Sequence, residues 1–330
     1  MQPFFSIIIP VYNTQEFIAK CLDSCIKQTF CDFEAIIIDD CGQDNSIDIA
    51  KKIIQNDLRF RIIKNIHNLG LFHTRIIGEM EAKGKYIICL DSDDFLSLDA
   101  LQNIYQSITD YYNHTGEFVD IAHFNFSFYP QQNKENACFH SLKEFNSITK
   151  NAKDLVDNYF ISHKFLSWNV WDKAYRAEIV KEVDDFIASQ FADIKKFTSC
   201  EDTFKTFLIV LFAQSNIKID KKLYNYAFIQ KDETITMSRI EDARYIASIL
   251  DTLDQTSIAL KNPSYMKAKT RIQKQIRQNI ETVLYRGMGG GGGDIMKYIN
   301  YQIKLLGIDF RWQNIVKIFL SLLTFGKLKK

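Results

Sequence analysis

Short apolar runs alternate with amphipathic segments along the first 95 residues, and this alternation restricts the fold more than any other feature. The apolar runs are rich in Ile, Val and Phe, as in strands buried on both faces, and cover residues 5–11, 33–39, 60–65 and 86–90. Helical spacing of apolar residues covers 14–28, 46–56 and 71–82. This order predicts a parallel sheet wrapped by helices, with all strands ending at one edge, where open α/β sheets bind ligands.

Candidate binding residues lie at the ends of these predicted strands. The first strand runs through Pro10 into Tyr12 and Asn13, the second runs through Asp39 into Asp40, and the fourth runs into Asp91, Ser92, Asp93 and Asp94. Because the strand ends converge, we expect one polar site there. Asp91 and Asp93 are candidates to hold a divalent cation together with diphosphate oxygens, the usual ligands of Mg²⁺ and Mn²⁺. The alternative is a simple helix cap, a role that suits Asp94.

Other residues near this edge suggest nucleotide recognition. A carboxylate of Asp39 or Asp40 can accept a hydrogen bond from a base N–H while Tyr12 stacks on that base. The same acidic pair can also serve only a turn. Asn68 and Arg75 follow the third predicted strand. Arg75 can bind a phosphate, pair with the acidic cluster, or lie on the surface.

Two further groups lie in the second half of the chain. Glu201 and Asp202 open a strongly apolar helix predicted over residues 201–213. Asp202 is a candidate general base for a hydroxyl nucleophile, although a helix N-terminus favours negative charge without any function. Trp168, Trp171 and Lys173 form an aromatic and basic cluster that can bind a sugar, with ordinary core packing as the alternative.

Charge is distributed unevenly, although the 330 residues carry a net charge of only +1. Residues 261–330 hold 14 Lys and Arg against 3 Asp and Glu, which leaves 27 against 37 for the first 260 residues. A basic tail on an acidic body predicts a polyanionic partner such as a membrane surface. The apolar, Lys-bounded stretch 312–330 is typical of a helix lying on a membrane, with packing on the core as the alternative.

The composition is that of a globular chain, 46% hydrophobic and 25% charged, and the length predicts about two units. The longest uncharged apolar run near the C-terminus, 318–326, is too short to span a bilayer. No basic segment precedes the first apolar run, so we expect no signal peptide. We therefore expect a cytoplasmic protein, peripheral on the inner face of the cytoplasmic membrane, with no nucleic acid partner.

A series of ordered segments resembles the signatures of the family 2 glycosyltransferases. They are SIIIPVYN, EAIIIDDCGQDNS, NIHNLGLFHTRIIG, GKYIICLDSDDFL, WNVWDKAYRAEIV, CEDTFKTFLIV and KKLYNYAFIQKDETIT. The resemblance covers about residues 4–240 and implies a GT-A fold, an α/β fold whose central, mostly parallel sheet is flanked by helices. It implies a GT-A domain over 1–240, with a nucleotide-binding half (1–95) and an acceptor-binding half (96–240). A mostly helical, basic region over 241–330 follows.

The same resemblance implies a role for each candidate residue. The UDP-sugar donor would contact Pro10, Tyr12, Asn13, Asp39, Asp40, Asn68, Arg75, Asp91 and Ser92, with Asp40 reading the base. Asp93, with Asp91, would hold Mn²⁺ or Mg²⁺. Asp202 would be the base of an inverting transfer to a glycan or lipid-linked acceptor of bacterial surface polysaccharide, such as capsule or lipooligosaccharide. The acceptor would contact Trp168, Trp171, Lys173 and Glu201.

Three other functions compete with this interpretation. A metal-dependent nucleotidyltransferase also uses carboxylates, but it usually shows a Gly-rich or basic triphosphate loop, and none follows the first predicted strand. A non-catalytic glycan-binding member of the family would need neither Asp93 nor Asp202. A dehydrogenase is disfavoured because the sequence has no GxGxxG motif.

Overall fold

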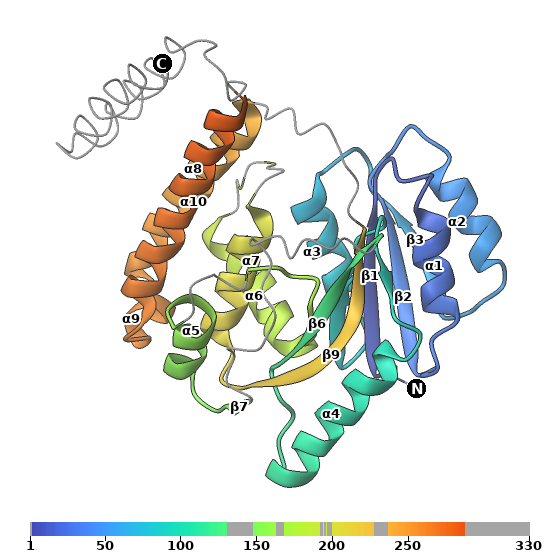
Figure 1. Cartoon of the computed structure of the whole chain (residues 1–330), viewed down its shortest axis with the longest axis horizontal. Coiled ribbons are helices and arrows are strands. Elements are labelled where there is room, and N and C mark those ends of the chain that lie inside the picture. The colour runs from blue at the N-terminus through green and yellow to red at the C-terminus, as the bar shows by residue number, and fades with distance from the viewer. Residues whose placement is uncertain are drawn as a thin grey trace, which may run out of the picture.

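The computed structural model describes residues 2–130, 148–162, 168–191, 194, 196, 200–227 and 237–287, arranged around one central sheet (Figure 1). The strands are β1 (Phe5–Val11), β2 (Phe33–Asp39), β3 (Phe60–Lys64), β4 (Tyr86–Cys89), β5 (Phe95–Leu96), β6 (Ile121–Tyr129), β7 (Ile148–Thr149), β8 (Lys173–Arg176) and β9 (Asn216–Ala227). The helices are α1 (Ile18–Ile26), α2 (Ser46–Ile54), α3 (Leu71–Glu81), α4 (Ala100–Thr115), α5 (Ala152–Phe160), α6 (Ala177–Gln190), α7 (Glu201–Phe212), α8 (Met237–Thr252), α9 (Ser257–Lys261) and α10 (Tyr265–Gly287), with the 3-10 helix η2 (Leu253–Gln255).

The sheet confirms the predicted α/β class, and its first four strands form the parallel part that was predicted. Its described strands run in the order β3-β2-β1-β4-β8-β6-β9-β5, and β7 pairs with β9. The four strands β3, β2, β1 and β4 are parallel, so their carboxyl ends meet at one edge. β8 is antiparallel to both β4 and β6 and thereby joins the two halves of the sheet.

The described elements follow the predicted ranges closely in the first half of the chain. The main difference is α1, which begins at Ile18 rather than at residue 14. The segment before it is held instead by the start of α2 and by the loop that precedes α2, because the backbone N–H of Thr14 donates to Ser46 Oγ at 2.8 Å and that of Gln15 donates to Asp44 Oδ2 at 2.9 Å. Of the predicted basic region 241–330, residues up to 287 are helical or in short turns, and the stretch 312–330 lies outside the described residues.

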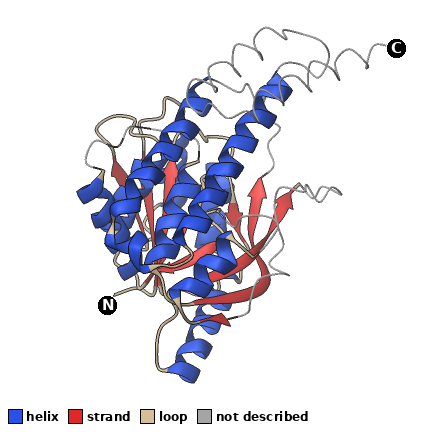
Figure 2. Ribbon diagram, turned by 90° about the vertical axis from the view of Figure 1, so that its left-hand side faces the viewer, coloured by secondary structure: helices blue, strands red, loops and turns tan. Residues whose placement is uncertain are grey.

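Two apolar cores cover the two faces of the sheet. Ile7 and Ile9 of β1 pack into the core under α1, α2 and α4, whereas Ile8 packs into the core shared with α3, α6 and α7. All residues of β1 are buried, which explains why the strand shows no polar alternation. Figure 2 shows the helices α8 and α10 in front of the sheet, outside the layer that contains α6 and α7.

A glycine sets how closely α3 approaches the sheet. A Cβ added at Gly78 would lie 2.5 Å from Ile8 Cγ2 and 2.7 Å from Ile38 Cδ1. Both side chains are fully buried and have no free space into which to move. The helix therefore lies deeper against β1 and β2 than a larger residue would allow.

We predict that Gly78→Ala lowers the free energy of unfolding by about 1–3 kcal/mol, since overpacking outweighs the gain in helix propensity. Urea unfolding followed by circular dichroism measures this change. Gln106→Ala, an exposed substitution on α4, is the matched control and should change the value by less than about 0.5 kcal/mol. An unchanged or raised stability for Gly78→Ala would show that α3 does not lie this close to the sheet.

Candidate active site

The carboxyl edge of the parallel strands brings acidic residues from distant parts of the chain together. Asp39 is the last residue of β2 and Asp40 follows it, Asp91 lies just after β4, and Asp202 lies in the first turn of α7. Arg75 reaches this edge from α3 and pairs there with Asp91 and Asp202. The convergence predicted from the strand order therefore extends to a helix that starts more than 100 residues later.

Arg75 connects the two halves of this edge. Its guanidinium donates from Nη2 to Asp91 Oδ1 at 2.6 Å and from Nη1 to Asp202 Oδ1 at 2.5 Å, while Glu201 Oε1 lies 3.9 Å from Nη1. Arg75 is only 5% exposed. Of the three roles considered for Arg75, the structure shows pairing with the acidic cluster. One cation thus serves three carboxylates from two separate segments.

Burial changes the proton affinities of Glu201 and Asp202. It raises the pKa of Asp202, and Arg75 opposes this rise by stabilising the charged form. Burial and the neighbouring Asp202 charge raise the pKa of Glu201 to about 7. The side chain of Asp202 nevertheless keeps 21% of its surface exposed. An accessible carboxylate with raised proton affinity has the properties required of a general base.

The loop after β4 holds three carboxylates within four residues. Asp94 is buried and ties the loop to β9, because its carboxylate accepts from Tyr224 Oη and from the Ala227 N–H, each at 2.6 Å. Burial and the charges of Asp91 and Asp93 raise the pKa of Asp94 to about 8. Ser92 is also buried. Asp94 thus has a structural role, whereas the negative potential of the loop suits a cation.

The donor set at this loop fits a hard divalent cation that is shared with a ligand. Asp91 gives only Oδ1 to Arg75, and no described residue donates a hydrogen bond to its Oδ2. Asp93 adds a second carboxylate two residues later. Among the described residues, no group of three or more His, Cys, Asp or Glu side chains forms a complete metal site. Two carboxylates would leave the remaining positions to phosphate oxygens and water, the coordination typical of Mg²⁺ and Mn²⁺.

The loops after β1 and β2 carry the candidate nucleotide residues. Pro10 is buried in β1, whereas the Tyr12 side chain is 49% exposed beside this edge. Asn13 has a positive φ of 53° and accepts from the Gln43 N–H at 2.7 Å, so the two loops are joined. Tyr12 is therefore held on an ordered loop with about half of its surface exposed.

Asp39 and Asp40 differ in how many internal partners they have. Asp40 accepts from the N–H groups of Leu69 and Gly70, at 2.7 and 3.0 Å, and from Asn65 Nδ2 at 2.8 Å. Both of its oxygens therefore hold the loop that precedes α3. Asp39 accepts from the Cys41 N–H at 3.0 Å through Oδ1, and its Oδ2 lies 3.7 Å from Lys64 Nζ.

The remaining candidates lie at different depths. Asn68 is partly exposed, and Lys196 Nζ donates to its backbone and side-chain oxygens. Trp168 is partly buried, and its carbonyl oxygen accepts from Thr206 Oγ1 at 2.8 Å. Trp171 is 3% exposed and stacks on Tyr224, with ring centroids 4.7 Å apart. Trp171 thus packs in the core beneath the site.

Lys173 is fully buried and takes part in a polar network below Asp202. Its ammonium donates to Asp172 Oδ1 and to the Asn169 carbonyl, and His123 Nε2 lies 3.3 Å from Asp172 Oδ2. Burial lowers the pKa of Lys173, while Asp172 and Asp202 favour its charged form. The described position of Lys173 is therefore internal rather than on an exposed surface.

Sequence reasoning missed a second set of buried ions one helical turn deeper. Lys205 Nζ lies 2.7 Å from Glu79 Oε2 and also pairs with Asp184 of α6. Glu79 follows Arg75 by four residues on α3, and Lys205 follows Asp202 by three on α7. The only signal in the sequence was one Glu and one Lys, each among the apolar residues of a predicted helix. Their spacings of four and three residues place Glu79 on the same helix face as Arg75, and Lys205 on the same face as Asp202.

Comparison with known proteins places this geometry in context. Residues 6–171, just over half of the chain, match the family model described as glycosyl transferase family 2. Glycosyltransferase GlyA of Streptococcus pneumoniae is 26% identical over 307 residues, an alignment that covers 91% of this chain and 40% of GlyA. The chain therefore spans less than half of the length of this curated relative.

Two solved structures show the same fold at low sequence identity. Residues 1–349 of Staphylococcus aureus TarS in complex with UDP-GlcNAc match with a TM-score of 0.59 at 20% identity, over 83% of this chain and 71% of that one. The mannosyltransferase PcManGT of Pyrobaculum calidifontis, in complex with GDP-Man and Mn²⁺, matches with a TM-score of 0.53 at 13% identity, over 97% and 84%. The GT-A fold is thus confirmed.

We predict that Arg75→Gln lowers the free energy of unfolding by about 3 kcal/mol at pH 8, because it leaves partly buried carboxylates without their counter-ion. The loss should be smaller at pH 5. Without Arg75, the folded-state pKa values of these acids rise further above their unfolded values, so folding is relatively favoured at low pH and stability falls as the pH rises. Urea unfolding at both pH values measures the two losses.

Arg61→Gln is the matched control, since the Arg61 side chain is 31% exposed and pairs with Glu34 and Glu81 at the surface. This substitution should cost less than about 1 kcal/mol at either pH. An equal, small cost for Arg75→Gln at pH 5 and pH 8 would contradict the central role of the Arg75 ion pairs.

Proposed function

The chain belongs to glycosyl transferase family 2, and we propose that it transfers a sugar from a UDP-sugar to a hydroxyl group of a glycan or lipid-linked acceptor, with inversion at the anomeric carbon. The observation that supports this proposal most strongly is the Arg75 bridge between Asp91 and Asp202. Asp91, a candidate cation ligand, and Asp202, the candidate base, pair with the same guanidinium. A donor held at the first would present its anomeric carbon near the second.

Asp202 is proposed as the general base. It would take the proton of the acceptor hydroxyl as the oxygen attacks the anomeric carbon in line and the bond to UDP breaks. Arg75 and a backbone hydrogen bond from Val170 hold the carboxylate in place, so its orientation is set before the acceptor arrives. Glu201, with its raised pKa, would lie beside the acceptor and limit the negative charge at the site.

The donor nucleotide is proposed to lie against Tyr12, whose exposed ring offers a face for the base. Asp39 is the better placed of the two acidic residues to accept from a base N–H, because both oxygens of Asp40 are already engaged in the loop. Pro10, Asn13, Asn68 and Ser92 would complete the nucleotide-sugar pocket. The UDP-GlcNAc bound to TarS supports uridine as the nucleotide.

Asp93 and Asp91 would hold Mn²⁺ or Mg²⁺, which would neutralise the charge that builds on the leaving diphosphate. The two carboxylates lie two residues apart on one loop, and the Asp91 Oδ2 accepts no hydrogen bond from a described residue, which supports this assignment. The Mn²⁺ in the PcManGT complex supports it as well.

The acceptor is proposed to belong to a bacterial surface polysaccharide. Hyaluronan synthase of Pasteurella multocida, whose name describes the synthesis of a polysaccharide, is 39% identical to this chain over 100 residues, which are 10% of its length. Trp168, which is partly exposed, and Glu201 are the proposed acceptor contacts. Trp171 and Lys173 are buried, so they would not contact the acceptor but would support the residues of the site by packing against them.

A panel of UDP-sugars tests the proposed function by metal-dependent hydrolysis and by mass spectrometry of the products with glycan and lipid-linked acceptors. We predict sugar release with Mn²⁺ and none with EDTA. Asp202→Asn should bind UDP as the native protein does but lower the rate at least about 100-fold, since it removes the base. Asp48→Asn, at an exposed acid on α2, is the control for the same chemical change.

Other outcomes of this assay would replace the proposal. Consumption of nucleoside triphosphates with release of pyrophosphate would indicate a nucleotidyltransferase. Binding of glycans without any release of sugar from UDP-sugars would indicate a non-catalytic glycan-binding protein. Full activity of Asp202→Asn would show that another residue acts as the general base.

We also propose that the basic C-terminal region binds an anionic membrane surface. Lys267, Lys274 and Arg277 are exposed on α10 at spacings of seven and three residues, which place them on one face of the helix. They belong to the segment 261–330, in which 14 basic residues stand against 3 acidic ones. Within the described residues, no helix combines the length and the apolar character needed to cross a bilayer.

Replacing Lys267, Lys274 and Arg277 with Glu should weaken binding to phosphatidylglycerol vesicles at least about tenfold, because each cation near an anionic surface contributes about 1 kcal/mol. Co-sedimentation with vesicles measures the change, and deletion of residues 295–330 should weaken binding further. A matched triple replacement at Lys27, Lys51 and Lys52 on the nucleotide-binding half should leave it unchanged. Equal binding by both variants would refute the membrane contact through this region.

A further inference from the structure

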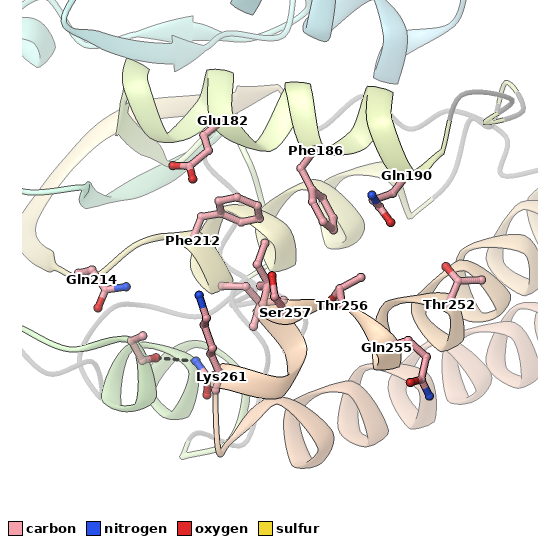
Figure 3. A pocket seen from close by; sticks show the side chains of 14 residues that line it. Glu182, Phe186, Gln190, Phe212, Gln214, Thr252, Gln255, Thr256, Ser257 and Lys261 are labelled. Atoms are coloured by element: carbon pink, nitrogen blue, oxygen red, sulfur yellow. Dashed lines mark hydrogen bonds between the residues drawn. The ribbon is translucent and has the colours of Figure 1, made fainter.

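A cleft of about 720 Å³ lies between α6 and the turn that joins α8 to α9 (Figure 3). Glu182, Phe186 and Gln190 line one side at intervals of four residues, so they form a continuous face of α6. Ser257 of α9 and Gln255 of the preceding 3-10 helix line the other side. The cleft therefore runs along the helix for about 12 Å, at 1.5 Å per residue.

This cleft is remote from the candidate active site. It includes Phe212 at the end of α7 and Gln214 just beyond it, whereas Asp202 lies in the first turn of the same helix. Ten residues of α-helix separate Phe212 from Asp202 by about 15 Å. A ligand in the cleft would thus occupy a separate site, without displacing the donor or the reacting hydroxyl.

We propose that this cleft binds a neutral oligosaccharide. Amides and hydroxyls dominate its polar lining, and these groups both donate and accept, as the hydroxyls of a sugar do. Figure 3 shows the rings of Phe186 and Phe212 among them, with centroids 5.4 Å apart. Aromatic rings offer an apolar surface to the C–H faces of a sugar ring.

Several polar groups in the cleft are available to a ligand. Gln214, Gln255 and Ser257 are exposed, and their side chains make no hydrogen bond to another residue of the described chain. A ligand can therefore bond with them without breaking internal contacts. The volume lies within the range of about 300–1,000 Å³ typical of small-ligand sites, enough for a di- or trisaccharide segment.

The lining argues against other ligand classes. Lys261 is the single cation among the described lining residues, and Glu182 offsets its charge, so a phosphorylated ligand would meet no basic cluster. A lipid chain would require a continuous apolar wall, whereas polar residues interrupt the rings on both sides. The chemistry of the site is that of an uncharged, hydroxyl-rich ligand.

Saturation-transfer NMR with a panel of neutral tri- to hexasaccharides of hexoses and N-acetylhexosamines tests the proposal. The protein is the full-length Asp202→Asn variant with saturating UDP and Mn²⁺, so that occupation of the nucleotide pocket and turnover do not contribute. We expect transfer to at least one saccharide. Titration calorimetry should then give a dissociation constant at least about tenfold higher for the added Gln214→Ala and Gln255→Ala substitutions, which remove two hydrogen-bonding groups.

The matched control is Gln106→Ala in the same background, which should leave the dissociation constant unchanged because Gln106 lies on α4, outside the cleft. If no saccharide of the panel shows saturation transfer from the protein, the proposal is overturned. Equal affinity of the cleft variant and the control would also overturn it, because the saccharide would then bind elsewhere. Since the measurement requires no sugar transfer, failure of the proposed enzymatic function would leave its result interpretable.

Discussion

The ion pairs of Arg75 with Asp91 and Asp202 are the interaction on which the arrangement of the site depends. Partly buried carboxylates repel one another, and the cation held among them allows the β4 loop and the start of α7 to share one edge. The depth of α3 allows Arg75 to reach this position. Gly78, three residues further along the same helix, permits the close contact with Ile8 and Ile38 that sets this depth.

A second buried ion pair runs between the same two helices with the opposite polarity. On α3 the cation Arg75 is followed one turn later by the anion Glu79, and on α7 the anion Asp202 is followed by the cation Lys205. Reversed pairs one turn apart fix both the register and the rotation of α7 against α3, since a shift of one turn would oppose like charges. The candidate base is therefore positioned by the packing of two helices rather than by a flexible loop.

Most of the first half of the fold was predictable from the sequence because its determinants are local. β1 and β2 are apolar runs bounded by polar residues, and their predicted ranges agree with the structure. Convergence at the carboxyl edge followed from the handedness of the crossovers. The pairing of Arg75 with Asp202 was not predictable, since it joins residues 127 positions apart. The internal role of Asp40 depends on backbone N–H groups, which leave no mark in the sequence.

In the proposed reaction, a cation-bound nucleotide and the carboxylate of Asp202 share one edge of the sheet. The most direct measurement is anomalous diffraction from crystals of the protein grown with Mn²⁺ and UDP. We expect a manganese peak in coordination contact with Asp93 or Asp91, diphosphate oxygens on the same ion, and Asp202 facing the same space. A peak in another region, or a nucleotide bound away from β1, β2 and β4, would contradict it.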